Sequence, residues 1–110
     1  MPKKNPSLKH DRFRSARGGK TRLLDIHCRG CGCFVATYQK DGPGSLLRMY
    51  LDRISSPDHL TGLQHLPLKD VPYLRCPGCG ALIGSPYVYT REKRLAFRIR
   101  PDGIDKRASK

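Results

Sequence analysis

The stretch "CFVATYQ" alternates its apolar side chains in the manner of a β-strand. Phe34, Ala36 and Tyr38 alternate with Val35 and Thr37, and residues of these types suit strands. Two glycines and a proline in the following "KDGPGS" are typical of a turn. The pattern therefore predicts a strand that ends at a turn near residue 42.

The next apolar run, "LLRMYLDRI", fits two patterns. Leu47, Met49 and Leu51 have the spacing of a strand, whereas Leu47, Leu51 and Ile54 have the spacing of a helix. The run is too short for its periodicity to decide between them. We favour a strand, because a β-hairpin through "DGPG" would join it to the preceding strand.

A second hairpin is predicted by "YVYTREKRLAFRIR" near the C-terminus. One face of its second strand is apolar and consists of Leu95, Phe97 and Ile99. The other face carries Arg94, Arg98 and Arg100, with Ala96 between them. Such a row of arginines is either a solvated strand face or a surface that contacts phosphate groups.

These segments divide the chain into three parts. Residues 1–22 form a basic arm that is disordered or extended, residues 23–100 form one small, mainly-β domain, and residues 101–110 form an extended basic tail. Within the domain, residues 55–72 are an insertion that contains Pro57, Pro67 and Pro72. "SPDHLTGL" could open a short helix within residues 55–66, with Ser56 as its N-cap.

Positive charge dominates the composition. The 110 residues include 22 Lys and Arg against nine Asp and Glu, which gives a formal net charge of +13. A domain with this excess attracts polyanions such as RNA or DNA. The basic residues of the N-terminal arm, which we expect to contact RNA, are Lys3, Lys4, Lys9, Arg12, Arg14, Arg17, Lys20 and Arg22.

Five cysteines suggest how so small a chain is stabilised. Two matching pentapeptides, "CRGCG" from Cys28 and "CPGCG" from Cys76, each place two thiols on one side of a tight turn. Two such pairs complete the tetrahedron of four thiolates that a structural zinc ion accepts. Only 37% of the residues are hydrophobic, so a small core would gain from such a metal.

The doubled motif resembles the zinc ribbon family, in which two knuckles stand on the ends of β-hairpins. By this resemblance, the ligands of one structural Zn²⁺ are Cys28, Cys31, Cys76 and Cys79, and an antiparallel sheet lies below them. Zinc ribbons occur in ribosomal proteins, RNA polymerase subunits and transcription factors. The resemblance covers roughly residues 23–100, although the spacer between the two pairs is longer than in compact ribbons.

The fifth cysteine and the histidines compete for a place at the metal. Cys33 lies beyond Gly32 at the start of a strand, so we expect its side chain to leave the metal and enter the core as a small apolar group. A ligand role and a redox role are the alternatives. His27 is expected to be a strand residue, and the remaining histidines, His10, His59 and His65, show no ligand spacing.

Nothing in the sequence favours catalysis. Four thiolates leave no open position on a zinc ion, and a thiol oxidoreductase would need one exposed C-x-x-C pair in a βαβ context. The carboxylates are few and scattered. We therefore expect a binding protein with no small-molecule substrate. Tyr87 or Tyr89 could stack on an unpaired base.

Basic arms beside a small metal-held sheet resemble small ribosomal proteins, and this is the function we favour. The partner would be ribosomal RNA, with neighbouring ribosomal proteins as further contacts. The alternatives are a zinc-ribbon transcription or RNA-processing factor and a protein-docking zinc module. The N-terminus shows no secretory signal, and no run reaches transmembrane length. We expect the ribosome in the cytoplasm as the location, with a mitochondrial one as the alternative, and no membrane as partner.

Overall fold

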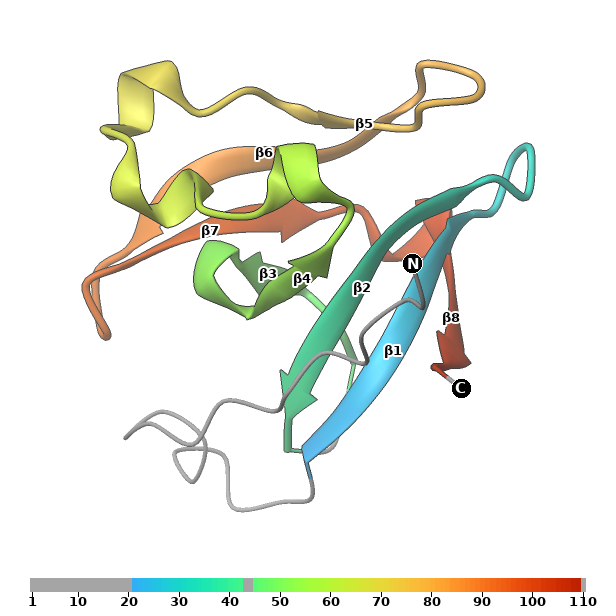
Figure 1. The fold of residues 1–110 in the computed structure, drawn as a ribbon, viewed down its shortest axis with the longest axis horizontal. Helices are drawn as coiled ribbons and strands as arrows, with labels where there is room; N and C mark the ends of the chain where they lie inside the picture. The colour runs from blue at the N-terminus through green and yellow to red at the C-terminus, as the bar shows by residue number, and fades with distance from the viewer. Residues whose placement is uncertain (1–20, 43–44, 110) are drawn as a thin grey trace, which may run out of the picture.

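The computed structural model describes residues 21–42 and 45–109, which fold into two four-stranded antiparallel sheets (Figure 1). The first sheet has the strand order β4-β2-β1-β8. Its strands are β1 (Thr21–Cys28), β2 (Phe34–Asp41), β4 (Ile54–Ser56) and β8 (Ile104–Ala108). The second sheet has the order β3-β7-β6-β5. Its strands are β3 (Arg48–Tyr50), β5 (Leu74–Arg75), β6 (Leu82–Tyr89) and β7 (Arg94–Ile99). The predicted mainly-β fold class is confirmed.

Short turns of 3-10 helix connect several strands. They are η1 (Leu51–Arg53), η2 (Asp58–Leu60), η3 (Leu63–His65), η4 (Leu68–Asp70) and η5 (Pro101–Gly103). In the described part of the chain, no helix has the length and apolar character needed to cross a membrane. Residues 55–66 were expected to contain a short helix, and they contain η2 and η3. Gly62 between these turns has a φ of 79°, which interrupts any continuous helix. Pro57, not Ser56, occupies the cap position of η2.

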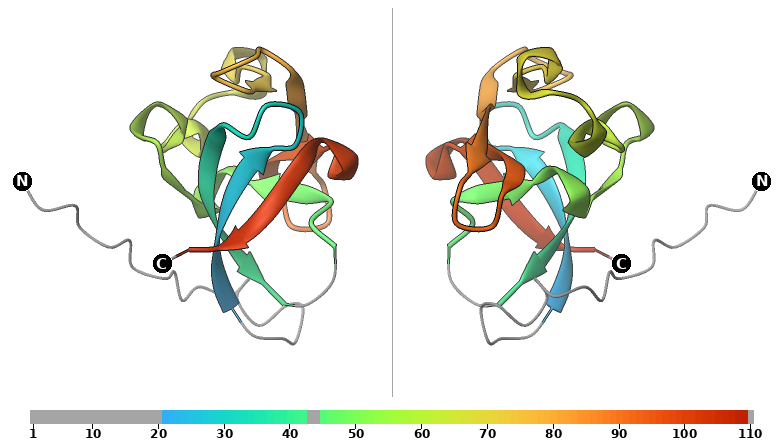
Figure 2. Two further views of the ribbon diagram at one scale, coloured as in Figure 1. Left: turned by 90° about the vertical axis from the view of Figure 1, so that its right-hand side faces the viewer. Right: turned by 90° about the vertical axis from the view of Figure 1, so that its left-hand side faces the viewer.

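Both sheets contribute to a single apolar core. Ile26 of β1 and Ala36 of β2 belong to the same buried cluster as Met49 of β3 and Phe97 of β7, and all four are fully buried. Leu60 and Leu63 of the 3-10 turns join this cluster. The turns lie beside the second sheet and close one side of the core (Figures 1 and 2). The inward placement of Phe97 and Ile99 confirms the predicted apolar face of the second hairpin.

The chain leaves the first sheet after β2, so the expected hairpin between β2 and the next strand is wrong. β3 pairs with β7 in the second sheet, where Met49 lies opposite Phe97. The run "LLRMYLDRI" follows neither single pattern, because Arg48–Tyr50 is extended and Leu51–Arg53 turns as η1. Leu47 is consequently 55% exposed, whereas Met49 and Leu51 are buried. The prediction thus identified part of this strand. It did not identify the partner strand, which lies nearly fifty positions further along the chain.

The C-terminal segment runs extended, as expected, and it is also paired. Residues 104–108 form β8, the edge strand of the first sheet, in which Cys28 lies opposite Ile104. Ile104 is 3% exposed and belongs to the core cluster. The basic arm lies almost wholly outside the described residues, but its last residue, Arg22, is an exposed residue of β1.

Candidate metal centre

Two β-hairpins carry the cysteine pairs to one place. Cys28 ends β1, and Cys31 lies in the turn that leads to β2. Cys76 follows β5, and Cys79 lies in the turn that leads to β6. Because the two hairpins belong to different sheets, the meeting of their tips joins the sheets at one end of the core (Figure 1).

The two pentapeptides fold in the same way. In the first knuckle, the Gly32 N–H donates to the Cys28 carbonyl at 2.7 Å; in the second, the Gly80 N–H donates to the Cys76 carbonyl at 2.9 Å. Each first cysteine also donates its own N–H five residues ahead, at 2.8 Å and 2.9 Å respectively. Gly32 and Gly80 have φ values of 80° and 76°, a conformation that glycine adopts without strain. The repeated sequence therefore specifies a repeated turn.

The four sulfur atoms form a compact cluster. All of them lie within 4.8 Å of one another. The Cys28 and Cys79 sulfurs are 3.8 Å apart, and the Cys31 and Cys76 sulfurs are 3.4 Å apart. Four thiolates at about 2.3 Å from a metal ion would stand about 3.8 Å apart at the corners of a tetrahedron. The separations also exceed the roughly 2 Å of a disulfide bond, and all the cysteines are free. The cluster can therefore hold one metal ion.

Backbone dipoles favour the thiolate form of Cys76. Burial opposes its ionisation, but N–H groups of Cys79 and Gly78 point at its sulfur, at 3.5 Å and 3.3 Å. Together with the thiols of Cys31 and Cys79, they lower the pKa of Cys76 to about 6. A metal ligand must be deprotonated, so this turn prepares the sulfur for coordination.

The remaining thiol belongs to the same surface but not to the cluster. Cys33 is exposed, so the expectation that its side chain enters the core is wrong. Its sulfur lies against Gly78 of the opposite knuckle, where a Cβ atom would overlap with it. Cys33 occupies the position that Ala81 has in the second knuckle, and its carbonyl closes the first turn. The side chain therefore faces the other hairpin tip instead of the space between the sheets.

None of the described histidines belongs to the sulfur cluster. His27 is a residue of β1, as predicted; its Nδ1 lies 3.1 Å from the Gly32 carbonyl, and its ring contacts Phe34 edge-on. His59 and His65 are exposed residues of η2 and η3. His10 lies outside the described residues. Among residues 21–42 and 45–109, the cysteine cluster is the group of potential ligands that could hold a metal.

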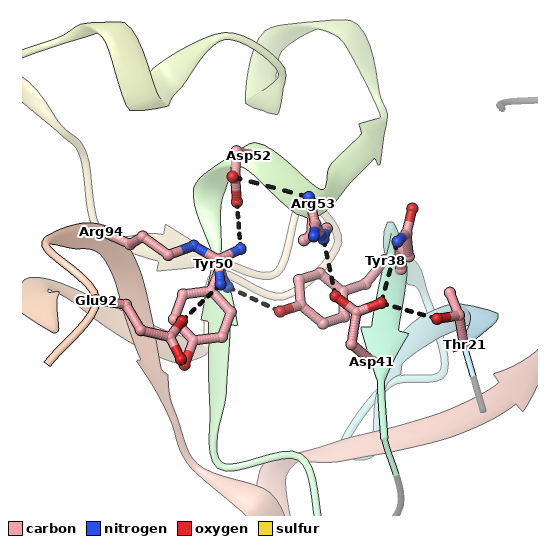
Figure 3. Close-up of polar contacts among 9 residues, drawn as sticks. Thr21, Tyr38, Asp41, Tyr50, Asp52, Arg53, Glu92 and Arg94 are labelled. Carbon is pink, nitrogen blue, oxygen red and sulfur yellow. Dashed lines mark hydrogen bonds and ion pairs between the residues drawn. The ribbon is translucent and has the colours of Figure 1, made fainter. Parts of the chain in front are cut away.

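The arginines predicted to share one strand face are separated by the structure. Arg98 and Arg100 are exposed, and Arg100 lines a hollow beside Cys28. Arg94 is only 7% exposed, which corrects its assignment to a phosphate-contacting face. It pairs with Asp52 and Glu92 at 2.8 Å each, and its guanidinium lies over the Tyr50 ring (Figure 3). Asp52 lies 42 positions from Arg94, so the strand pattern gives no sign of this pair, whereas Glu92 lies only two positions away and is a local signal for an ion pair.

A different arginine, outside the row predicted along β7, lies beside Arg98. Arg48 of β3 is directly opposite Arg98 of β7. The strand-like pattern around Met49 indicated that Arg48 is extended, but nothing in it indicated which strand would be its neighbour. The other predicted RNA contacts of the arm, from Lys3 to Lys20, lie outside the described residues.

Comparisons with protein-family models, with curated proteins and with solved structures found no match for this chain. The cysteine cluster is consistent with a zinc-binding knuckle module.

Proposed function

We propose that this chain is an RNA-binding structural protein whose fold is held together by a zinc ion. The observation that carries the proposal is an imbalance of surface charge: in the described part of the chain, ten exposed residues are basic and three are acidic. The exposed acidic residues are Asp58, Asp70 and Asp102. A surface of this kind gains free energy by releasing the counterions of a polyanion.

The fold sharpens this imbalance by withdrawing acidic side chains from the surface. Arg53 is buried and pairs with Asp41 at 3.0 Å and with Asp52 at 3.8 Å. Arg94 is buried beside Asp52 and Glu92 (Figure 3). Three of the few carboxylates are thereby used to compensate two internal arginines, and the exposed lysines and arginines keep their charge. Basic residues of the arm, which lies outside the described part, would add to the same interaction.

The cysteine cluster supports a structural role for the metal. Four thiolates close the coordination sphere of zinc, so no position is left for a substrate or a water molecule. The cluster stands at the junction of the two sheets, where a bound ion would fix the hairpins to each other. Zinc suits four thiolates in a tetrahedral arrangement. We therefore assign no catalytic step to this centre.

Within this function, we favour a ribosomal protein that contacts ribosomal RNA, as the resemblance of the cysteine motifs to zinc ribbons implied. The alternative is a transcription or RNA-processing factor that uses the same surface transiently. The two functions differ in how permanently the protein would be bound to the ribosome. A ribosomal component stays on the ribosome through a high-salt wash, whereas a factor is released.

A protein-docking module is a second candidate, and one observation favours it. Apolar side chains are exposed together in the segment that follows η3, where Leu66, Leu68 and Tyr73 are 38%, 42% and 58% exposed. Prolines 67 and 72 are exposed in the same segment. Aromatic and apolar surface of this kind is typical of contacts between proteins. It is compatible with RNA binding if the neighbours are other ribosomal proteins.

The test is a titration of RNA affinity against salt concentration, with the zinc-loaded full chain and a ribosomal RNA fragment. Each phosphate that the protein neutralises adds about 0.7 to 0.9 to the slope of log affinity against log salt. A steep slope is expected. A flat slope, or affinity confined to acidic proteins, would overturn the RNA-binding proposal and favour protein docking. Co-sedimentation with ribosomes through a high-salt wash then separates a ribosomal component from a factor.

A further inference from the structure

The outer face of the second sheet carries an organised group of arginines and tyrosines. In the strand pairing, Arg48 lies opposite Arg98, and Ala96 lies opposite both Tyr50 and Tyr87. Directly opposed residues of antiparallel strands point to the same side of the sheet. The alternate residues Met49 and Phe97 are fully buried in the core. The arginines and tyrosines therefore face away from the core.

Cation–π contacts link these side chains into one stack. The Arg48 guanidinium carbon lies 4.0 Å from the centre of the Tyr89 ring, and that of Arg98 lies 4.7 Å from the centre of the Tyr87 ring. Arg48 Nε also donates to the Tyr87 hydroxyl at 3.1 Å. Because the tyrosines hold both guanidinium groups, little conformational freedom remains to be lost when a ligand binds. We call Arg48, Arg98, Tyr87 and Tyr89 the Arg–Tyr face.

Among the described residues, no acidic side chain compensates the charge of this face. Four residues before Arg98 on β7, Arg94 pairs with two carboxylates. Within residues 21–42 and 45–109, by contrast, no carboxylate oxygen lies within 4.0 Å of the Arg48 or Arg98 nitrogens. Like charges directly opposite each other on antiparallel strands are destabilising. An anion placed between the two guanidinium groups would remove that repulsion.

The guanidinium groups and tyrosine rings at this site indicate which kind of molecule would carry the anion. A guanidinium pairs with phosphate through two parallel N–H bonds, and it stacks on nucleobases as an aromatic ring does. Arg98 is exposed and Tyr87 is half-buried, so a flat ligand can reach them. Bases offer their flat surfaces to a protein only where they are unpaired.

We propose that the Arg–Tyr face is a binding site for single-stranded RNA, in which Arg48 and Arg98 share a backbone phosphate and an adjacent unpaired base stacks beside Tyr87. This site rests on the proposed RNA-binding function and specifies the form of RNA that it takes. It also differs from the row of arginines along β7, because its two arginines come from neighbouring strands.

The experiment compares two variants that lose the same charge. Arg48→Gln/Arg98→Gln removes both arginines of the face, and Lys106→Gln/Arg107→Gln removes two exposed cations from β8 in the other sheet. The probes are a twelve-nucleotide oligouridylate, an RNA duplex of the same length and a polyglutamate peptide. Zinc content and thermal unfolding of both variants confirm that the fold is retained. The single variant Arg98→Gln, at an exposed position, serves if the double variant does not fold.

The variant of the Arg–Tyr face is expected to bind oligouridylate at least tenfold more weakly than the wild type, and the β8 variant less than threefold. The single variant Arg98→Gln should weaken binding at least threefold. Binding of the duplex should change equally in both double variants. Equal loss of oligouridylate affinity in the two double variants would overturn the site while leaving RNA binding intact. Preferred binding of polyglutamate at this face would overturn it as well. A wild type that binds neither RNA would remove the proposed function and the site together.

Discussion

The thiol of Cys33 rests against Gly78. Cys33 follows the first knuckle and Gly78 lies in the second, so this contact joins the two hairpin tips. A Cβ atom on Gly78 would overlap with the Cys33 sulfur, and it would lie 3.1 Å from Cys33 Cβ and 3.4 Å from the Cys31 sulfur. Gly78 therefore has a role beyond its own turn, because its missing side chain lets the two hairpin tips approach. Their approach, in turn, brings the four other sulfurs together.

Gly78→Ala is expected to weaken metal binding by separating the knuckles. Overpacking of a tight contact costs about 1–3 kcal/mol, which corresponds to a loss of roughly 5- to 150-fold in zinc affinity. Adding Cys33→Ala should restore much of that affinity, since it removes the overlapping sulfur. Competition with a chromophoric chelator measures both changes.

Gly30→Ala is the matched control, because Gly30 holds the same place in the first knuckle. A Cβ atom there meets only the Cys28 sulfur, at 3.8 Å, which is an ordinary contact. Its effect on zinc affinity should be small. Equal losses for Gly78→Ala and Gly30→Ala would contradict the role assigned to Cys33.

Removal of the metal should unfold the domain. Structural zinc contributes on the order of 10 kcal/mol to the folding of small modules. We expect one zinc ion per chain, loss of that ion in Cys76→Ala/Cys79→Ala, and its retention in Cys33→Ala. Metal analysis and circular dichroism before and after chelation provide the measurement. One zinc ion retained in the double variant would show that other residues bind it.

Arg94→Gln should reduce stability and leave RNA binding unchanged. The substitution removes one cationic partner of Asp52 and Glu92, whose side chains are 24% and 17% exposed. Because water reaches both carboxylates, we expect a loss of about 1–3 kcal/mol in the free energy of unfolding. Denaturant unfolding and the salt slope of RNA affinity are measured on the same variant. If Arg94→Gln kept full stability but lowered the slope of log RNA affinity against log salt, Arg94 would be a phosphate contact after all.

Arg53 and Asp41 form a buried ion pair that should matter more to stability. Their side chains are 1% and 6% exposed, and Asp41 also accepts hydrogen bonds from Thr21 and Gln39 (Figure 3). Arg53→Met leaves a buried carboxylate without its cation, at a cost of about 3–5 kcal/mol. The double variant Arg53→Met/Asp41→Leu should lose less than the single one. Denaturant unfolding tests this order, and a double variant that is the less stable of the two would contradict it.

Deletion of residues 1–20 should flatten the salt slope of RNA affinity without releasing zinc. The segment carries seven of the 22 lysines and arginines, and the described fold begins after it. Each phosphate contact that is lost lowers the slope by about 0.7 to 0.9. The zinc content of the truncated chain is the control. An unchanged slope would remove the arm from the proposed RNA-binding surface.

The sequence predicted correctly those parts of the structure that depend on interactions between residues close together in the chain. The strand around Ala36, the hairpin of β6 and β7 and the cysteine turns were all predicted, because alternation and glycine positions fix a conformation within a few residues. The same pattern could not show that β2 and β3 belong to different sheets. Register and pairing depend on which apolar faces meet, and those faces come from distant parts of the chain.

The sequence by itself determined the mainly-β class, the two matching knuckles and the excess of positive charge. The tertiary structure alone decided which arginines are accessible. Arg94 and Arg98 alternate correctly on one strand, yet Asp52 and Glu92 neutralise the first, and the second faces Arg48. Alternation states to which side of a sheet a residue points, but burial and charge compensation depend on what the rest of the chain brings to that side.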